Sequence, residues 1–252
     1  MASKPLHTLT QDECSKYFEF LKGNAAEQWK IADTLSTAEQ YGAATSHLLI
    51  SIEESIKSII VFMDSQGYQF RSVKGIDTIF SNHRIRFFIA YFMFAIGIFG
   101  DDLIKWLKEV KQNPELIQEH MKLFVGQDDL PLPLKYYFLR KLALLKTEMI
   151  FFKNADLIRQ IGFYVDYNEQ VQSPQAMTKD TYKEIYQRME KLKRFVKGLI
   201  DAYTPSDETM NKLIAKNKQL FNDEKYYKLI EDGLFKVKKT KSSPFDLLNE
   251  SL

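Results

Sequence analysis

Apolar residues recur with a helical period along most of the chain, and the clearest such segment spans residues 40–62. At 100° per residue, one broad face of this predicted helix is formed by Leu49, Ile52, Ile56, Ile59 and Ile60. A narrow polar stripe, with Glu53 and Lys57 on its flank, consists of His47, Ser51, Glu54 and Ser58. Because an unpaired buried carboxylate is costly, we expect Glu54 to meet a cation or donor from another helix, or to lie at a cleft. The alternative is a salt bridge with Lys57 or Arg86 that only fixes packing.

Further segments carry the same period. Thr10 and Glu13 have the spacing of a capping box, which opens an amphipathic helix running to about residue 35. We expect this helix to pack against that of residues 40–62 as an antiparallel hairpin. Residues 87–99 are uncharged but too few to cross a bilayer, so they predict a buried core helix. Asp101 and Asp102 are expected to cap a next short helix, and Asn113 to begin another. Residues 127–134 read as a loop, and periodicity returns over residues 135–161.

The pattern as a whole predicts an all-α helical bundle. Glycine and proline are sparse, at 10 and 7 residues, and no convincing pair of strands is found. The aromatic-rich stretch that ends near Pro174 is expected to be extended. We predict a helical core over residues 10–175, a charged helical extension over residues 178–233 and a disordered, lysine-rich tail over residues 236–252.

The composition limits the kinds of site that can be present. Thirty-five basic and 33 acidic residues give a net charge of +2, which neither requires nor excludes a nucleic-acid partner. Cys14 is the only cysteine, which excludes an intramolecular disulfide and every cysteine-based zinc pattern. The first residues lack the apolar run of a secretory signal. We expect a cytoplasmic protein that needs no metal or other cofactor and does not enter a membrane.

His83 is a candidate for chemistry because it combines a group that titrates near neutrality with the cations of Arg84 and Arg86. Acid–base catalysis at a phosphodiester would use such a combination. The simpler interpretation is a histidine that caps a helix or is solvated.

A second candidate segment follows the helix of residues 135–161. Arg159 could clamp a phosphate with two hydrogen bonds, and Tyr164 could stack on a base or donate a hydrogen bond. In the alternative interpretation, the aromatic residues fix the loop to the core while Asp166 pairs with Arg159.

Three short motifs occur in order along the chain: SIEE at residues 51–54, FSNHRIR at residues 80–86 and FYVD at residues 163–166. Together with Asn24, Ala25, Tyr41 and Ala44 before them and Pro174 after them, they resemble the AbiV family of bacterial abortive-infection proteins. That family belongs to the HEPN superfamily of helical domains. The resemblance spans roughly residues 24–174.

The resemblance implies a HEPN-like helical bundle that pairs as a homodimer and acts in phage defence by shutting down gene expression. Many HEPN proteins are metal-independent ribonucleases that use an arginine closely followed by a histidine. This sequence departs from that pattern, because Arg71 lies too far before His83. A composite catalytic site would instead use Glu54, His83, Arg86, Arg159 and Tyr164. Substrate would be bound by Lys57, Arg84 and Asp166.

Two main hypotheses follow. In the first, the chain is a dimeric defence effector that acts on RNA or the ribosome. His83 is then the general acid or base, Arg86 and Arg159 stabilise the charge on the phosphorane, and Glu54 orients one of these groups. In the second, the chain is a non-enzymatic binding protein that arrests translation or senses a phage protein, which could also be an activator. A third, less favoured hypothesis is a partner of a nucleotidyltransferase.

Overall fold

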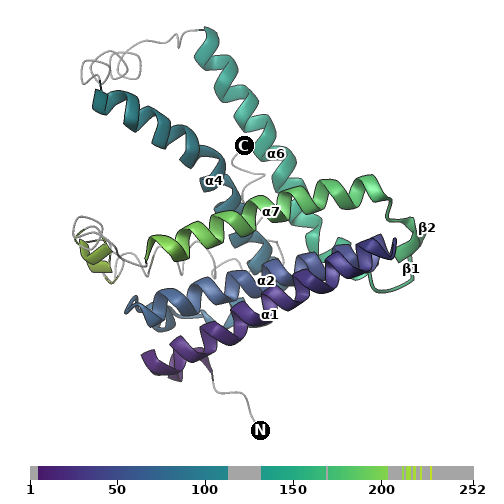
Figure 1. The fold of residues 1–252 in the computed structure, drawn as a ribbon, viewed down its shortest axis with the longest axis horizontal. Coiled ribbons are helices and arrows are strands. Elements are labelled where there is room, and N and C mark those ends of the chain that lie inside the picture. Colours follow the sequence, from purple (N-terminus) through teal and green to yellow (C-terminus); the bar gives the residue numbers. More distant parts are fainter. Residues whose placement is uncertain are drawn as a thin grey trace.

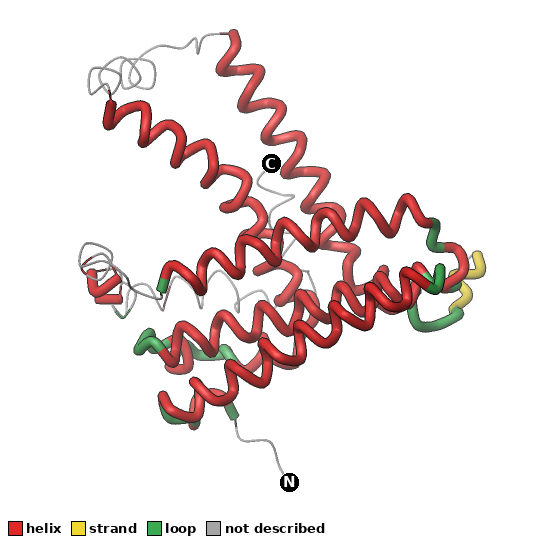
Figure 2. Tube along the Cα trace, in the orientation of Figure 1, coloured by secondary structure: helices red, strands yellow, loops and turns green. Residues whose placement is uncertain are grey.

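The computed structural model describes residues 5–112, 132–168 and 170–203, and the isolated residues 212, 214–216, 218, 219, 222 and 228. Helices dominate it (Figure 2). They are α1 (Gln11–Thr37), α2 (Tyr41–Ser65), α3 (Asp77–Ser81), α4 (His83–Gln112), α6 (Leu132–Ile161) and α7 (Lys179–Ala202). Short 3-10 turns lie at Leu6–Thr8, Phe70–Ser72 and Pro174–Ala176. The predicted all-α fold is confirmed.

Helix α2 is the central element, since it packs against α1, α4, α6 and α7. Helices α1, α2 and α7 run alongside one another, whereas α4 and α6 project away from them (Figure 1). The α1–α2 hairpin is as predicted. Helix α1 begins at the expected capping box, in which the Thr10 hydroxyl accepts from Glu13 N at 3.2 Å and the Glu13 carboxylate accepts from Thr10 N at 2.7 Å.

Helix α2 is buried on nearly all sides because its polar residues are mostly small. The Ser51 hydroxyl donates to the Ala25 carbonyl of α1 at 2.7 Å, and the Ser55 hydroxyl donates to the Ser51 carbonyl at 2.8 Å. These bonds satisfy buried hydroxyls without bulky side chains, so neighbouring helices can approach closely. The aliphatic face of α2 joins aromatic residues of α4 and α6 in the main core.

Helix α7 shares this core. Its buried side chains are Tyr182, Ile185, Met189 and Leu192, and they belong to the same cluster as Leu48 and Ile52 of α2. The boundary expected between residues 175 and 178 therefore falls between elements that pack together. Most of the rest of the expected extension, and the tail, lie outside the described residues.

Three local predictions were wrong. Helix α4 runs without interruption from His83 to Gln112, so Asp101 and Asp102 cap no new helix. Helix α6 begins at Leu132, inside the expected loop, since Pro133 is tolerated in a first turn. The extended segment contains a strand pair, in which β1 (Asp166–Asn168) runs antiparallel to β2 (Gln170–Gln172) with Tyr167 opposite Val171. The helix expected to begin at Asn113 lies outside the described residues.

The apolar run of residues 87–99 lies within α4 and supplies Phe87, Ala90, Tyr91 and Phe94 to the main core. Within the described parts of the chain, no helix is both long enough and apolar enough to span a membrane.

Candidate functional site

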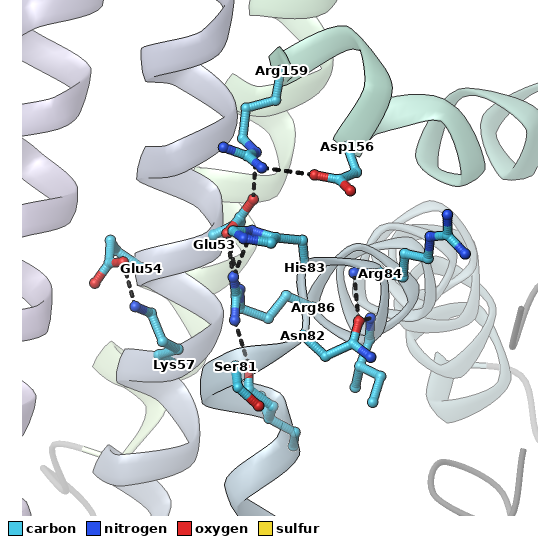
Figure 3. Close-up of polar contacts among 12 residues, drawn as sticks. Glu53, Glu54, Lys57, Ser81, Asn82, His83, Arg84, Arg86, Asp156 and Arg159 are labelled. Carbon is cyan, nitrogen blue, oxygen red and sulfur yellow. Dashed lines mark hydrogen bonds and ion pairs between the residues drawn. The ribbon is translucent and has the colours of Figure 1, made fainter. Parts of the chain in front are cut away.

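A buried carboxylate on α2 faces the first turn of α4. Glu53 is 3% exposed, and its Oε2 accepts from Arg86 Nη2 at 2.6 Å and from Arg86 Nε at 3.0 Å. The same oxygen lies 2.7 Å from His83 Nδ1. Figure 3 shows Glu53 pointing toward both side chains and toward Arg159 of α6. Burying this charge is possible because cations and donors surround it.

The start of α4 fixes the position of the histidine. The Asn82 side-chain oxygen accepts from Arg84 N at 3.0 Å and from Ile85 N at 3.3 Å, as a helix cap does. His83 is therefore the first residue of α4, and its side chain lies in the first turn beside Arg86. The positive end of the helix dipole at this point favours an anion nearby.

Two side chains lie within hydrogen-bonding distance of His83 Nδ1. Its Nδ1 lies 2.7 Å from the Glu53 carboxylate and 2.7 Å from Arg86 Nη2. With a proton on Nδ1 the ring donates to Glu53, and without one it accepts from Arg86, so either tautomer has a partner. The side chain is 40% exposed, and Nε2 lies on the side of the ring away from these partners. Proton transfer at Nε2 thus leaves Nδ1 hydrogen-bonded.

Helix α6 completes the cluster with a second pair of charges. Arg159 Nε lies 3.4 Å from Glu53 Oε1, and Arg159 Nη2 donates to Asp156 Oδ1 at 2.8 Å. Burial raises the pKa of Asp156, but the hydrogen bond and charge of Arg159, with smaller effects of His83 and Gln160, more than offset it and lower that pKa. Asp156 is therefore an anion at neutral pH.

Close contact between two backbones places Arg159. A Cβ on Gly162 would lie 2.0 Å from the Ser46 hydroxyl oxygen and 2.4 Å from the Gly42 carbonyl oxygen, so only glycine fits there. The Ser46 hydroxyl also donates to the Arg159 carbonyl at 2.6 Å. These contacts hold the end of α6 against α2 and direct Arg159 toward Glu53.

We name these five residues the Glu53 cluster: Glu53, His83, Arg86, Asp156 and Arg159. The two arginines and the two carboxylates balance in formal charge. Arg86 is also 3% exposed, and its Nη1 donates to the Ile79 carbonyl at 2.7 Å. Its donors are thus directed at Glu53, His83 and the backbone, behind the histidine rather than toward solvent.

A pocket of about 360 Å³ opens beside this cluster. The described residues that line it are all polar, namely Thr78, Ser81, Asn82, His83, Arg84 and Asp156. Arg84 is exposed, unlike the two arginines of the cluster. A polar pocket with an exposed guanidinium and an imidazole suits a charged or strongly hydrogen-bonding ligand.

The other residues singled out from the sequence lie elsewhere. Within the described residues Glu54 pairs with Lys57 of its own helix α2, so the alternative interpretation describes it. The exposed fraction of Tyr164 is 66%, and this residue follows the end of α6. Asp166 lies in β1, and Arg159 pairs with Asp156, one turn earlier on α6.

Sequence reasoning missed two members of the cluster. Glu53 was placed only on the flank of the polar stripe, although it is the carboxylate that meets His83 and Arg86. Asp156 was not considered, although its spacing of three residues before Arg159 on a helix is a recognisable ion-pair signal. Among the described residues, no group of three or more His, Cys, Asp or Glu side chains is arranged to hold a metal ion.

Comparison with known proteins agrees with this architecture. A family model described as AbiV, of the HEPN type, matches residues 13–194, which is more than half of the chain. The match begins in α1, ends in α7 and includes every member of the Glu53 cluster. No curated protein and no solved structure matches the chain. The chain belongs to the AbiV family of HEPN domains.

Proposed function

We propose that this protein is an abortive-infection effector that cleaves RNA without a metal ion, with His83 as its acid–base group. Family membership supports the role in defence against phage. One observation carries the chemistry: the Nδ1 side of His83 is held by Glu53 while the ring borders a polar pocket. This arrangement resembles the carboxylate-oriented histidines that serve as general bases.

The proposed reaction is transfer within the RNA chain. His83 Nε2 accepts the proton of a ribose 2′-hydroxyl, the O2′–P bond forms and the P–O5′ bond breaks. The departing 5′ oxygen takes a proton from solvent water, and the imidazolium returns its proton to solvent. The products are a 2′,3′-cyclic phosphate and a 5′-hydroxyl, and no oxidant or metal is consumed.

Burial assigns the arginines different roles in this proposal. Arg84 is exposed at the pocket and contacts the phosphate, helped by the amino-terminal end of α4. Arg86 and Arg159 are positioning residues, because their guanidinium groups contact Glu53 instead of facing solvent. Glu53 takes the orienting role that the sequence suggested for Glu54. Tyr164, Lys57 and Asp166 stay outside the proposed chemistry.

The test compares His83→Ala with the wild-type protein on total RNA and on ribosomes, in the presence of a chelator. We expect new RNA ends that carry 2′,3′-cyclic phosphates in the wild type and none in the variant. His7→Ala is the matched control, since His7 is an exposed histidine paired with Asp77. Equal cleavage by His83→Ala and wild type would refute the role of His83.

A binding protein is the second candidate function. It is favoured by two adjacent side chains, Tyr164 and Val165, whose exposed fractions are 66% and 68%. Such a protein would arrest translation by occupying a partner, or would sense a phage protein. Phage resistance that persists in a folded His83→Ala variant but is lost in Tyr164→Ser would support this alternative.

The proposal also includes a homodimer. Phe92 and Ile96 are 42% and 57% exposed and lie one turn apart on α4, which makes them candidates for a contact between two copies. Light scattering of the purified protein measures the mass directly. A monomer at micromolar concentration would remove the dimer from the proposal.

A further inference from the structure

One wall of the pocket beside His83 consists mainly of hydrogen-bond acceptors. The Thr78 hydroxyl donates to the Gly75 carbonyl at 2.7 Å, and the Ser81 hydroxyl donates to the Thr78 carbonyl at 3.4 Å. Both hydroxyl protons are therefore directed at the backbone, and the oxygens present lone pairs. With the Asp156 carboxylate, this wall of the pocket mainly accepts hydrogen bonds.

Asp156 is held as a rigid acceptor. Its Oδ1 accepts from Arg159 at 2.8 Å and its Oδ2 accepts from Gln160 at 3.2 Å, so both oxygens are fixed from the side of α6. A carboxylate has about four acceptor sites, and these bonds use one on each oxygen. Its side chain is 20% exposed and lines the pocket. One acceptor site thus remains on each of the two adjacent oxygens for a ligand.

Among the four RNA bases, guanine matches two parallel acceptors best. Its Watson–Crick edge presents two adjacent donors, N1–H and the N2 amino group. Adenine and cytosine each place one amino group beside a ring nitrogen that accepts, and an ionised carboxylate repels that lone pair. Uracil has a single donor between two carbonyl oxygens. A carboxylate therefore favours guanine through one more hydrogen bond and one less repulsion.

The opposite side of the pocket can complete the recognition. The side-chain oxygen of Asn82 is used to cap α4, so the amide nitrogen is the part of this side chain that can serve a ligand. That nitrogen is a donor, which suits guanine O6. The pocket volume of about 360 Å³ can hold a base with its ribose and phosphate.

We propose that Asp156 is a specificity-determining residue that accepts hydrogen bonds from a guanine base in this pocket. The phosphate next to this base then lies beside His83 and Arg84. This inference rests on the proposed ribonuclease for its place in a reaction. The binding it predicts can be measured without any cleavage.

The experiment titrates the full-length protein calorimetrically with the 3′-monophosphates of guanosine, adenosine, cytidine, uridine and inosine. We expect the guanosine nucleotide to bind about tenfold or more tightly than the other three RNA nucleotides. Inosine lacks the N2 amino group, so we expect it to bind about tenfold more weakly than guanosine. This comparison leaves the protein unaltered and cannot be confused with misfolding.

Asp156→Asn provides the matching change in the protein. An asparagine presents one acceptor beside one donor, which suits adenine and cytosine alike, so we expect the preference to move from guanosine to these two nucleotides. Glu27→Gln removes one negative charge from an exposed position on α1 and should keep the guanosine preference. Equal binding of the four RNA nucleotides, no binding at all, or an unchanged preference in Asp156→Asn would overturn the inference. If the protein prefers guanosine but does not cleave RNA, only the proposed ribonuclease activity is refuted.

Discussion

Glu53→Gln should destabilise the protein strongly, because one neutralised side chain leaves the buried Arg86 without its anion and leaves the partly buried Arg159 with Asp156 alone. Glu53 Oε2 is 2.6 Å from Arg86 Nη2, and Oε1 is 3.4 Å from Arg159 Nε. Removing one partner of a buried ion pair costs about 3–5 kcal/mol. For a domain of this size, 1 kcal/mol corresponds to about 2–4 °C, so we expect Tm to fall by about 6–20 °C.

The adjacent residue supplies the control. Glu54→Gln makes the same chemical change one position along α2, but the partner of Glu54 in the described part of the chain is Lys57 of its own helix. This pair joins residues three apart on one helix, which contributes about 0.2–0.5 kcal/mol when exposed, and its side chains are 12% and 15% exposed, so we expect a smaller fall in Tm than for Glu53→Gln. Scanning calorimetry of the two variants in the same buffer gives the comparison. Similar shifts for Glu53→Gln and Glu54→Gln would refute the assignment of Glu53 as the shared anion.

A double-mutant cycle isolates the contact from the general effect of lost charge. We expect Glu53→Gln with Arg86→Gln to cost less than the sum of the single variants, since the second change removes a cation that the first has left unpaired. The coupling energy between residues in one ion-pair network is about 0.5–3 kcal/mol. Denaturant unfolding of the four proteins measures it, and strict additivity would show that the two side chains do not interact.

Three further predictions concern other parts of the fold. Gly162→Ala should destabilise by about 1–3 kcal/mol through overpacking. At Gly198 an added Cβ would meet no atom beyond its own stretch of helix within 4 Å among the described residues, so Gly198→Ala should stabilise α7 slightly. Thermal unfolding tests both. Burial raises the pKa of Asp64 to about 6 from an ordinary 3.8, although Arg71 opposes the change. The folded state therefore binds this proton more tightly, and the stabilisation is present below about pH 4 and lost as pH rises through 6. Through Asp64 the free energy of unfolding should fall by about 3 kcal/mol between pH 4 and 7.5, and Asp64→Asn should reduce this fall. Urea titrations at the two pH values measure it. Glu148→Gln should cost about 1.5–3 kcal/mol, since Arg188 Nε donates to both carboxylate oxygens at 3.1 Å between α6 and α7; an unchanged urea midpoint would contradict this.

The helices themselves were largely predictable from the sequence, because their causes are local. The Thr10–Glu13 capping box sets the start of α1, and the aliphatic period of residues 40–62 identifies α2 and its burial. Charge content and length sufficed to place residues 87–99 in the core. Prediction failed where a local signal was ambiguous. Asp101 and Asp102 resemble a helix cap, yet α4 continues through them to Gln112.

The site was decided by tertiary structure. Glu53 and Glu54 are adjacent, differ by 100° around α2 and have the same chemistry, so the period alone cannot tell which one faces α4. The packing of α4 against α2 makes that choice and brings His83 and Arg86 to Glu53. Arg159 joins them because Gly162 lets the chain at the end of α6 approach the backbone of α2. The sequence by itself determined which segments are helical and which side chains are apolar. Long-range contacts decided which carboxylate is shared and which residues surround His83, since both depend on the register of helices far apart in the chain.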